Sequence, residues 1–373
     1  MSQSTRRFSF GLGQPEDKEQ ILEILEQNDF KGRISILYTR RPNAYASLKK
    51  EGDEVSIVVC KDSQKNKIVG FGACGVRKLY INGKEEKAGY LFALRERKEY
   101  KKTYALLSRG YHFLHSLHQD VPLFLTTILE ENLYAQKLLE KKRACMPAYE
   151  PFGLYEVYTI KTKRKDKQKH PFHFKRTEKT DIPALVKFLN YQGKKYQFFP
   201  VIEREELISE DCTHEKYPGL TYEDFFILYG QGGEILAAGA AWDQKKYKQY
   251  IIQGYKGILK FCSPLSSLLA SLGYPALVRP GTILKFFTLS FWAVRDNDPY
   301  LFTSFLNQFS ASLHDYPFFL IGLHEKNPLR NVLRKIPHLV YRSRIYLVDW
   351  NKSGSVVDKL EPERFPYLEC GML

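Results

Sequence analysis

The chain has 373 residues, of which 43% are hydrophobic, and a formal net charge of +15. This length and apolar content fit two folded domains and exclude a disordered chain. The charge predicts anionic partners such as CoA, nucleotides, nucleic acid or acidic lipid head groups. Six scattered cysteines without a Cys-x-x-Cys motif exclude a dense disulfide framework, and no apolar stretch follows Arg6-Arg7 as it would in a secretory signal. We therefore expect a cytoplasmic protein.

The first part of the chain predicts a helix followed by antiparallel strands. Pro15 begins a helix with one apolar face, and Asn82-Gly83 is a strong hairpin turn. The strand before this turn contains Gly70, Gly72 and Gly75, which indicate a bulge or close packing. The predicted strands are residues 56–60, 67–80 and 88–95.

A basic loop leads from the third of these strands into an amphipathic helix. The loop spans residues 96–103, the helix follows from 106 to 117, and a buried strand at 123–128 precedes a further helix. The unpaired N–H groups and partial positive charge of a helix N-terminus suit an anion such as a pyrophosphate. Lys98 and its basic neighbours add charge there, although a solvated basic turn explains the same composition.

These residues give the segment a resemblance to the GNAT superfamily of N-acyltransferases. The stretch from Leu94-Arg95 to Lys102 resembles the family's strand and pyrophosphate loop, and Asn132-Leu133-Tyr134-Ala135 matches its Asn-x-x-Ala helix start. With Lys101 at the first loop position, the family's two glycine positions fall on Tyr104 and Leu106. The resemblance implies acetyl-CoA or another acyl-CoA as co-substrate, and a cofactor site made of Leu94, Arg95, Arg97, Lys101, Lys102, Thr103, Tyr104 and Asn132.

The second part of the chain repeats this plan after a basic linker. Residues 163–171 contain many cations and no apolar residue, which favours a tether over a nucleic-acid arm because no aromatic side chain is interleaved. In the repeat, Val294-Arg295 corresponds to Leu94-Arg95, and Asp296 and Asp298 stand where a phosphate loop belongs and repel an anion. We expect an α/β fold of the α+β type, with two tandem GNAT-like domains, each a mixed, mostly antiparallel sheet flanked by helices, over residues 1–162 and 172–373.

An insertion at residues 245–273 interrupts the second copy. It joins cations and tyrosines to a predicted amphipathic helix that begins at Ser263-Pro264 and ends at Gly273. Such a segment either contacts a membrane surface peripherally or packs on its own domain. No stretch is apolar enough to span a bilayer, because Lys260 and Pro264 interrupt the best candidate.

Acyl transfer to an amine requires a base for the ammonium and an acid for the leaving thiolate. Glu130 and Glu131 follow the second buried strand, where the substrate and the cofactor should meet, and either is a candidate base. Tyr134 or Tyr104 is the candidate acid. The three histidines of the 112–118 stretch do not converge at helical geometry, so we expect no metal.

The sequence therefore predicts an acyl-CoA-dependent N-acyltransferase of the GNAT type, which moves an acyl group from a CoA thioester to an unidentified amine. Two alternatives stay open. One is a catalytically inactive GNAT-fold module that binds an acidic or acyl-bearing partner. The other is a tRNA-dependent aminoacyl transferase, in which the net charge of +15 would serve the tRNA.

Overall fold

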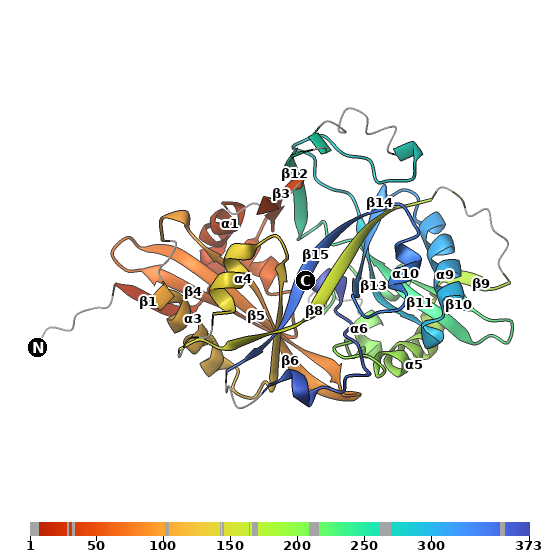
Figure 1. Ribbon diagram of the computed structural model, residues 1–373, viewed down its shortest axis with the longest axis horizontal. Coiled ribbons are helices and arrows are strands. Elements are labelled where there is room, and N and C mark those ends of the chain that lie inside the picture. Colours follow the sequence, from red (N-terminus) through yellow and green to blue (C-terminus); the bar gives the residue numbers. More distant parts are fainter. Residues whose placement is uncertain are drawn as a thin grey trace, which may run out of the picture.

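The computed structural model has one long sheet that both parts of the chain share (Figure 1). The structure describes residues 7–27, 30–31, 34–100, 104–141, 143, 145–163, 165, 171–208, 216–257, 259–260, 270–350 and 355–373. Most of the predicted helix at 263–273 lies outside these residues, as do Lys101, Lys102, Thr103 and the side chain of Tyr104. We call the residues up to 162 the first half and those from 172 the second half.

The strands and helices follow the predicted order in each half. The strands are β1 (Phe8–Leu12), β2 (Phe30–Lys31), β3 (Ile34–Thr39), β4 (Glu54–Asp62), β5 (Lys67–Ile81), β6 (Lys84–Glu96), β7 (Leu123–Leu129), β8 (Ala148–Lys161), β9 (His173–Arg176), β10 (Phe225–Tyr229), β11 (Ile235–Trp242), β12 (Gln249–Tyr255), β13 (Phe287–Val294), β14 (Phe318–His324) and β15 (His338–Asp349). The helices are α1 (Lys18–Glu26), α2 (Ala44–Leu48), α3 (Tyr104–Leu117), α4 (Leu133–Leu139), α5 (Ile182–Gly193), α6 (Arg204–Ile208), α9 (Pro299–Ser312) and α10 (Arg330–Leu333).

The strand order reads almost the same from either end of the sheet. It is β1-β4-β5-β6-β7-β15-β8-β14-β13-β11-β10-β9, in which β6 and β7 pair in parallel, as do β13 and β14, and all other neighbours are antiparallel. The two parallel pairs are joined by the long helices α3 and α9. A parallel pair requires such a crossover, so each half contains one strand–helix–strand unit. The chain is therefore an internal repeat.

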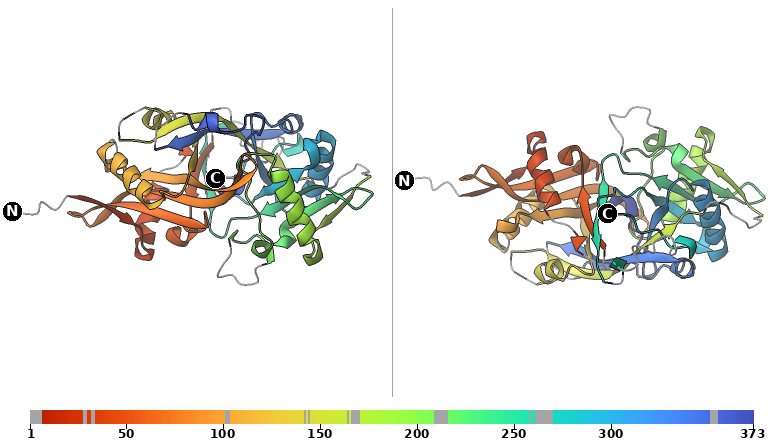
Figure 2. Two further views of the ribbon diagram at one scale, coloured as in Figure 1. Left: turned by 90° about the horizontal axis from the view of Figure 1, so that it is seen from below. Right: turned by 90° about the horizontal axis from the view of Figure 1, so that it is seen from above.

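The two halves exchange their last strands at the centre of the sheet (Figure 2). Strand β8 of the first half pairs with β14 of the second half, and β15 of the second half pairs with β7 of the first half. β8 and β15 also pair with each other along most of their length. The halves are thus joined by backbone hydrogen bonds and not only by side-chain packing.

Alternating side chains direct the helices of the first half to opposite faces of the sheet. Ile57 and Val59 of β4 pack with the buried face of α1, whereas Val58 packs with Tyr111 and Leu114 of α3. This period of two is what a strand covered on both faces requires. The long strand–helix–strand unit is held in place by these two layers.

A bulge bends one strand of each parallel pair at the same place. In β6 two residues, Ala93 and Leu94, lie opposite the single residue Gly72 of β5, and Ala93 adopts a φ of +54°. In β13 two residues, Phe291 and Trp292, lie opposite the single residue Gly239 of β11, and Phe291 adopts a φ of +48°. We call such pairs the doubled residues. Each parallel pair covers only two or three residues before its strands diverge. Bulges of this kind re-aim the backbone, so each half contains a V-shaped opening between diverging strands.

Part of the 245–273 insertion forms a small sheet with the first half. Its strand β12 pairs antiparallel with β3, which pairs in turn with β2. The described part of this insertion therefore contacts the other half of the chain. Among the helices of the described residues, none is long and apolar enough to cross a membrane.

Candidate active site

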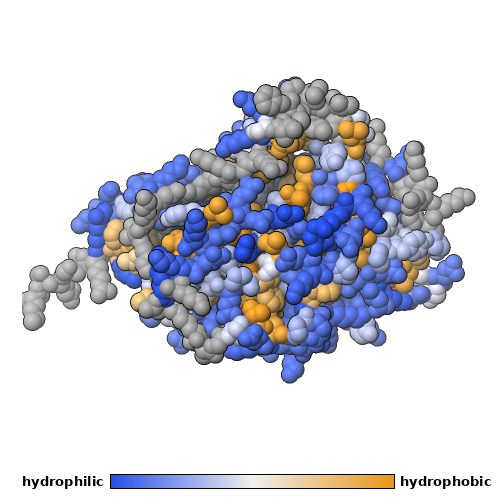
Figure 3. All heavy atoms as spheres, viewed as in Figure 1, coloured by the Kyte–Doolittle hydropathy of each residue, from blue (hydrophilic) through white to orange (hydrophobic). Residues whose placement is uncertain are grey.

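The diverging strands of the first half open into a cavity of about 1380 Å³. Its walls come from the ends of β6 and β7, from α3, from the facing strands β3 and β12, and from β15. In the space-filling view, apolar side chains lie around a hollow near β3 and β12, on a face that is mostly hydrophilic but carries other apolar spots (Figure 3). The exchanged strand β15 and the insertion strand β12 both belong to the second half, so this site needs both halves.

The bulged end of β6 presents main chain to this cavity. Phe92, Ala93 and Leu94 line it, beyond the last residue at which β6 pairs with β7, Tyr90. Thr126 of β7 donates its hydroxyl to the Leu91 carbonyl at 2.7 Å and so satisfies a carbonyl two residues before the bulge residue Ala93. The strand edge from Phe92 onward therefore faces a space large enough for a ligand.

The opposite end of the same edge is basic. Arg95 lines the cavity together with Lys98, and helix α3 begins close by at Tyr104. The Arg95 guanidinium donates to the Leu94 carbonyl at 2.9 Å, and burial lowers its pKa. A partly buried cation on the approach to a helix N-terminus is an environment that an anionic ligand would stabilise.

Arg97 and Asn132, two further predicted cofactor residues, make contacts that organise the backbone. Arg97 is buried, donates to the Ile68 carbonyl at 2.7 Å and pairs with Glu23 of α1 at 2.7 Å. Asn132 lines the cavity and accepts a hydrogen bond from the Ala135 amide at 3.2 Å, which makes it the N-cap of α4. An N-cap of this type fixes the start of the helix.

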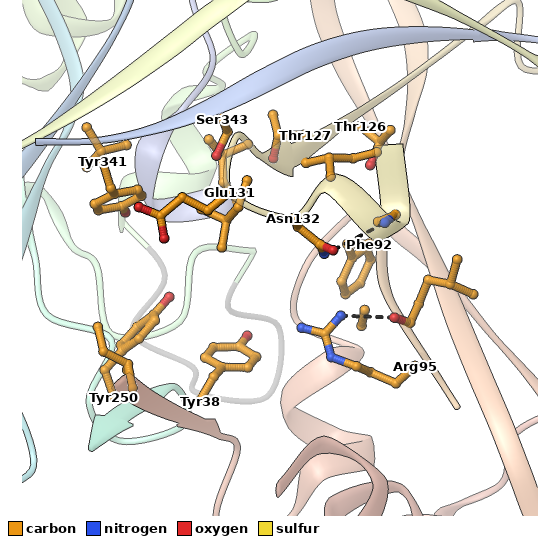
Figure 4. A pocket seen from close by; sticks show the side chains of 18 of the residues that line it. Tyr38, Phe92, Arg95, Thr126, Thr127, Glu131, Asn132, Tyr250, Tyr341 and Ser343 are labelled. Carbon is orange, nitrogen blue, oxygen red and sulfur yellow. Dashed lines mark hydrogen bonds between the residues drawn. The ribbon is translucent and has the colours of Figure 1, made fainter. Parts of the chain in front are cut away.

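The two glutamates predicted as bases reach the cavity, whereas Tyr134 is not among its lining residues. Glu130 and Glu131 lie at the turn after β7, and the Glu131 carboxylate points toward Tyr341 of β15, across the cavity from Arg95 (Figure 4). Tyr134 is 54% exposed on α4. The structure thus brings together Leu94, Arg95, Glu130, Glu131 and Asn132 around one space.

A buried ionic cluster at the wall of the cavity, which Arg40 and Glu51 help to line, was not predicted from the sequence. Glu51 accepts from Arg40 at 2.5 Å and lies 3.4 Å from the ammonium of Lys248, and all three are almost fully buried. Burial disfavours the Glu51 charge, but Lys248 and Arg40 outweigh it and lower its pKa to about 2. Burial lowers the pKa of Lys248 to about 8. The cluster joins the α2 region of the first half to the insertion of the second.

Lys248 also holds the last residues of the chain. Its ammonium donates to the main-chain oxygens of Gly371 at 3.2 Å and Leu373 at 2.9 Å. Cys370, Met372 and Leu373 line the cavity, and the C-terminal end of the chain lies between the two halves (Figure 1). Sequence patterns give no signal for such a contact, because its partners come from distant parts of the chain.

The corresponding opening of the second half holds a carboxylate of the protein itself. The amide of Phe291, the bulge residue of β13, donates to Glu369 at 2.6 Å. Glu369 is 4% exposed. The two halves therefore have the same bulge in two different states, one facing a cavity and one bound to an internal acid.

Among the described residues, no group of three or more His, Cys, Asp or Glu side chains is arranged to hold a metal ion. Of the three histidines predicted not to converge, His115 stacks on Trp350 at 5.0 Å, and His118 is buried with its pKa lowered by burial. His112 is exposed. His115 and His118 thus take part in packing at the far end of α3.

No protein-family model matches the sequence, and no curated protein matches it significantly. The structure is similar to that of Saccharomyces cerevisiae N-myristoyltransferase with bound myristoyl-CoA, at 13% identity over 92% of this chain and 82% of that chain, with a TM-score of 0.57. It is also similar to a GCN5-related N-acetyltransferase from Sphaerobacter thermophilus, at 10% identity over 92% and 96%, TM-score 0.53. A third match is a GCN5-related N-acetyltransferase from Anabaena variabilis, at 15% identity over 91% and 72%, TM-score 0.51.

These likenesses define the class of fold. The chain has a tandem GNAT fold, which confirms the fold predicted from Leu94-Arg95, from Asn132 to Ala135 and from the internal repeat. In particular, the fold is like that of N-myristoyltransferase over 92% of this chain. At this level of identity, the likeness establishes the fold alone.

Proposed function

We propose that the protein is an acyl-CoA-dependent N-acyltransferase whose reaction takes place in the first half. The observation that carries this proposal is the contrast between the two bulges. The bulge of the second half binds a carboxylate oxygen through the Phe291 amide at 2.6 Å, so its geometry suits an oxygen ligand. The equivalent edge of the first half, at Ala93, lines a cavity of about 1380 Å³ instead. A thioester carbonyl is the oxygen that this edge would receive.

The chain fits an acyl-CoA as co-substrate in three respects. The edge at Phe92–Leu94 offers main-chain donors, which stabilise the negative charge that develops on the carbonyl oxygen. Arg95 and Lys98 line the cavity near the start of α3 and are the residues we propose for the pyrophosphate. Lys101 and Lys102 stay predicted members of this anion site from the sequence alone. The cavity exceeds the roughly 300–1,000 Å³ of typical ligand sites, so it has room for both a donor and an acceptor.

The reaction forms an amide bond and breaks the thioester bond. A neutral amine attacks the carbonyl carbon, and CoA leaves as its thiolate, which takes up a proton to become the thiol. The incoming ammonium must first lose a proton, and we assign this role to Glu131, whose carboxylate points into the cavity. Glu130 is the second candidate base. Tyr134 stays the predicted acid, and its exposed position on α4 requires that the donor reach the cavity mouth.

Titration of CoA and of acyl-CoAs from acetyl to myristoyl tests the proposal, with free thiol release in the presence of an amine as the activity assay. We expect Arg95→Ala to raise the Kd for CoA roughly tenfold or more, since a hydrogen bond to a charged group is worth about 1.5–3 kcal/mol. Arg295→Ala, which removes an arginine directly after the bulged strand of the second half, is the control and should leave the Kd unchanged. Failure of the wild-type protein to bind any of these donors would contradict the proposal. Binding without transfer would favour the inactive module.

A further inference from the structure

The internal repeat gives each residue of the first bulge a counterpart in the second. Phe92 pairs with Ala73 just before the doubled residues of β6, and Ser290 pairs with Ala240 just before those of β13. Ala93 therefore corresponds to Phe291, and both have a positive φ. The second half has kept the backbone shape of a ligand-binding bulge, and its ligand is on the same chain.

Glu369 is bound there by donors alone. One carboxylate oxygen accepts from the Phe291 amide at 2.6 Å and from the Tyr367 hydroxyl at 2.8 Å. The other accepts from the Gly371 amide at 3.1 Å. Tyr367 in turn accepts a hydrogen bond from the amide of Trp292, the second doubled residue, at 3.1 Å. Burial raises the pKa of Glu369, while three donors facing its oxygens favour the ionised form.

The chain on both sides of Glu369 is fixed to the rest of the protein. The Tyr367 amide donates to the Gln197 carbonyl at 2.8 Å, and the Leu368 carbonyl accepts from Tyr155 of β8 at 2.7 Å. The Gly371 carbonyl accepts from the Gln244 side chain at 2.7 Å and from Lys248. A Cβ added at Gly371 would lie 2.5 Å from Trp242, so the backbone there is tightly enclosed.

The residues that follow this anchor belong to the cavity of the first half. Cys370, Met372 and Leu373 line it together with Tyr250 of the insertion and Gln244, which precedes the insertion. In the close-up view Tyr250 lies across the cavity from Arg95, the basic residue at the donor end (Figure 4). Gly371 and Leu373 accept hydrogen bonds from Gln244 and Lys248, which come shortly before Tyr250 in the chain. We therefore place the segment after Glu369 on the side of the cavity opposite Arg95, where an acceptor would meet the donor.

We propose that the bulge of the second half is a carboxylate-binding site whose ligand is Glu369, and that this contact positions residues 370–373 as the acceptor-side wall of the first-half cavity. Glu369 is a positioning residue, because it acts through the segment that follows it. The expected effect of Glu369 on the KM for the amine rests on the proposed transferase function. The anchoring itself is a property of the fold and is measurable without any activity.

The test compares Glu369→Gln with Glu363→Gln, an exposed glutamate of the same segment. Cys370 is the reporter, because burial raises the pKa of its thiol to about 12 and so disfavours the thiolate that reacts with an alkylating agent. Its alkylation rate in the folded protein is measured by mass spectrometry of the peptide that contains it. We expect Glu369→Gln to accelerate alkylation roughly tenfold or more. The Phe291 amide would lose its charged acceptor, and the NH2 group of the glutamine would take the place of one carboxylate oxygen among the donors. Glu363→Gln should match the wild type.

Kinetics then separate a positioning role from a merely structural one. We expect Glu369→Gln to raise the KM for the amine while the Kd for CoA, set at the other side of the cavity, stays the same. Unchanged alkylation of Cys370 in a folded variant would overturn the anchoring. Faster alkylation with an unchanged KM for the amine would overturn the positioning role.

The experiments distinguish a failure of the proposed function from a failure of the proposed anchoring. If the wild type binds no acyl-CoA, the proposed function fails, and the alkylation rates still decide whether Glu369 anchors the segment. If Glu369→Gln does not fold, Tyr367→Phe replaces it: this variant removes one donor to Glu369 and keeps the ring. Tyr367→Phe should accelerate alkylation in the same direction, and an unchanged rate would overturn the anchoring.

Discussion

Replacing Glu51 by glutamine tests the buried ionic cluster that joins the two halves. The carboxylate lies 2.5 Å from Arg40 and 3.4 Å from Lys248, and all three side chains are almost fully buried. The glutamine variant leaves two cations buried without their anion, which costs about 3–5 kcal/mol of stability. Lys248 can lose its proton to limit this cost. Deprotonation itself costs about 1.4 kcal/mol for each unit by which the pKa of the lysine lies above the pH of the solution.

The assay is urea unfolding followed by far-UV circular dichroism. For an m-value of about 3 kcal/mol/M, the Glu51→Gln variant should unfold at a midpoint lower by about 1 M or more. Glu54→Gln is the control, because Glu54 pairs with Lys87 at 3.5 Å on the surface and its loss should leave the midpoint unchanged. Adding Lys248→Met to Glu51→Gln should recover part of the loss, since it removes one unpaired cation. Equal midpoints for Glu51→Gln and the wild type would refute this reasoning.

Three further predictions concern the bulges, the pH dependence and the proposed base. A Cβ on Gly239 would lie 2.8 Å from Leu289, whereas one on Gly72 would lie 3.5 Å from Leu94, so Gly239→Ala should lower stability by about 1–3 kcal/mol and Gly72→Ala should not, as urea midpoints will show. The pKa of Lys248 is about 8 in the folded protein and about 10.4 in an unfolded chain, so the unfolded state binds more protons between these values. Stability should rise with pH through that window, and Lys248→Met should remove this slope. Glu131→Gln should lower kcat by about 10²-fold or more at neutral pH with little change in the Kd for CoA, and a wild-type kcat would exclude Glu131 as the base.

Features set by local chemistry could be predicted from the sequence. The Asn82-Gly83 turn joins β5 and β6 as predicted, with a positive φ at both residues. The glycines of β5 indicated a bulge, and the structure places it opposite Gly72. The strand–helix–strand order likewise follows from periodicity, and it brings Arg95 and Glu131 to one cavity.

Features that depend on partners far away in the chain could not be predicted from the sequence. The exchange of β8 and β15 is invisible in the sequence, because two similar closing strands fit either half by pattern alone. The correspondence of Val294-Arg295 with Leu94-Arg95 was wrong by two residues, since the bulges align Trp292 with Leu94. The place of the bulge in a strand depends on which residue adopts a positive φ, and the residue types in the sequence do not determine which residue this is. Glu369 gave no signal, because the strand β13, whose Phe291 amide binds its carboxylate, lies far away along the chain.

Hydrogen–deuterium exchange with a non-hydrolysable acyl-CoA analogue tests most directly which half of the protein is loaded. The full chain is labelled with and without the analogue, and the amides of residues 92–95 and of the start of α3 are compared with those of β13. The account predicts that the analogue protects the first-half amides and leaves β13 unchanged. Protection at β13 or at neither site would contradict it.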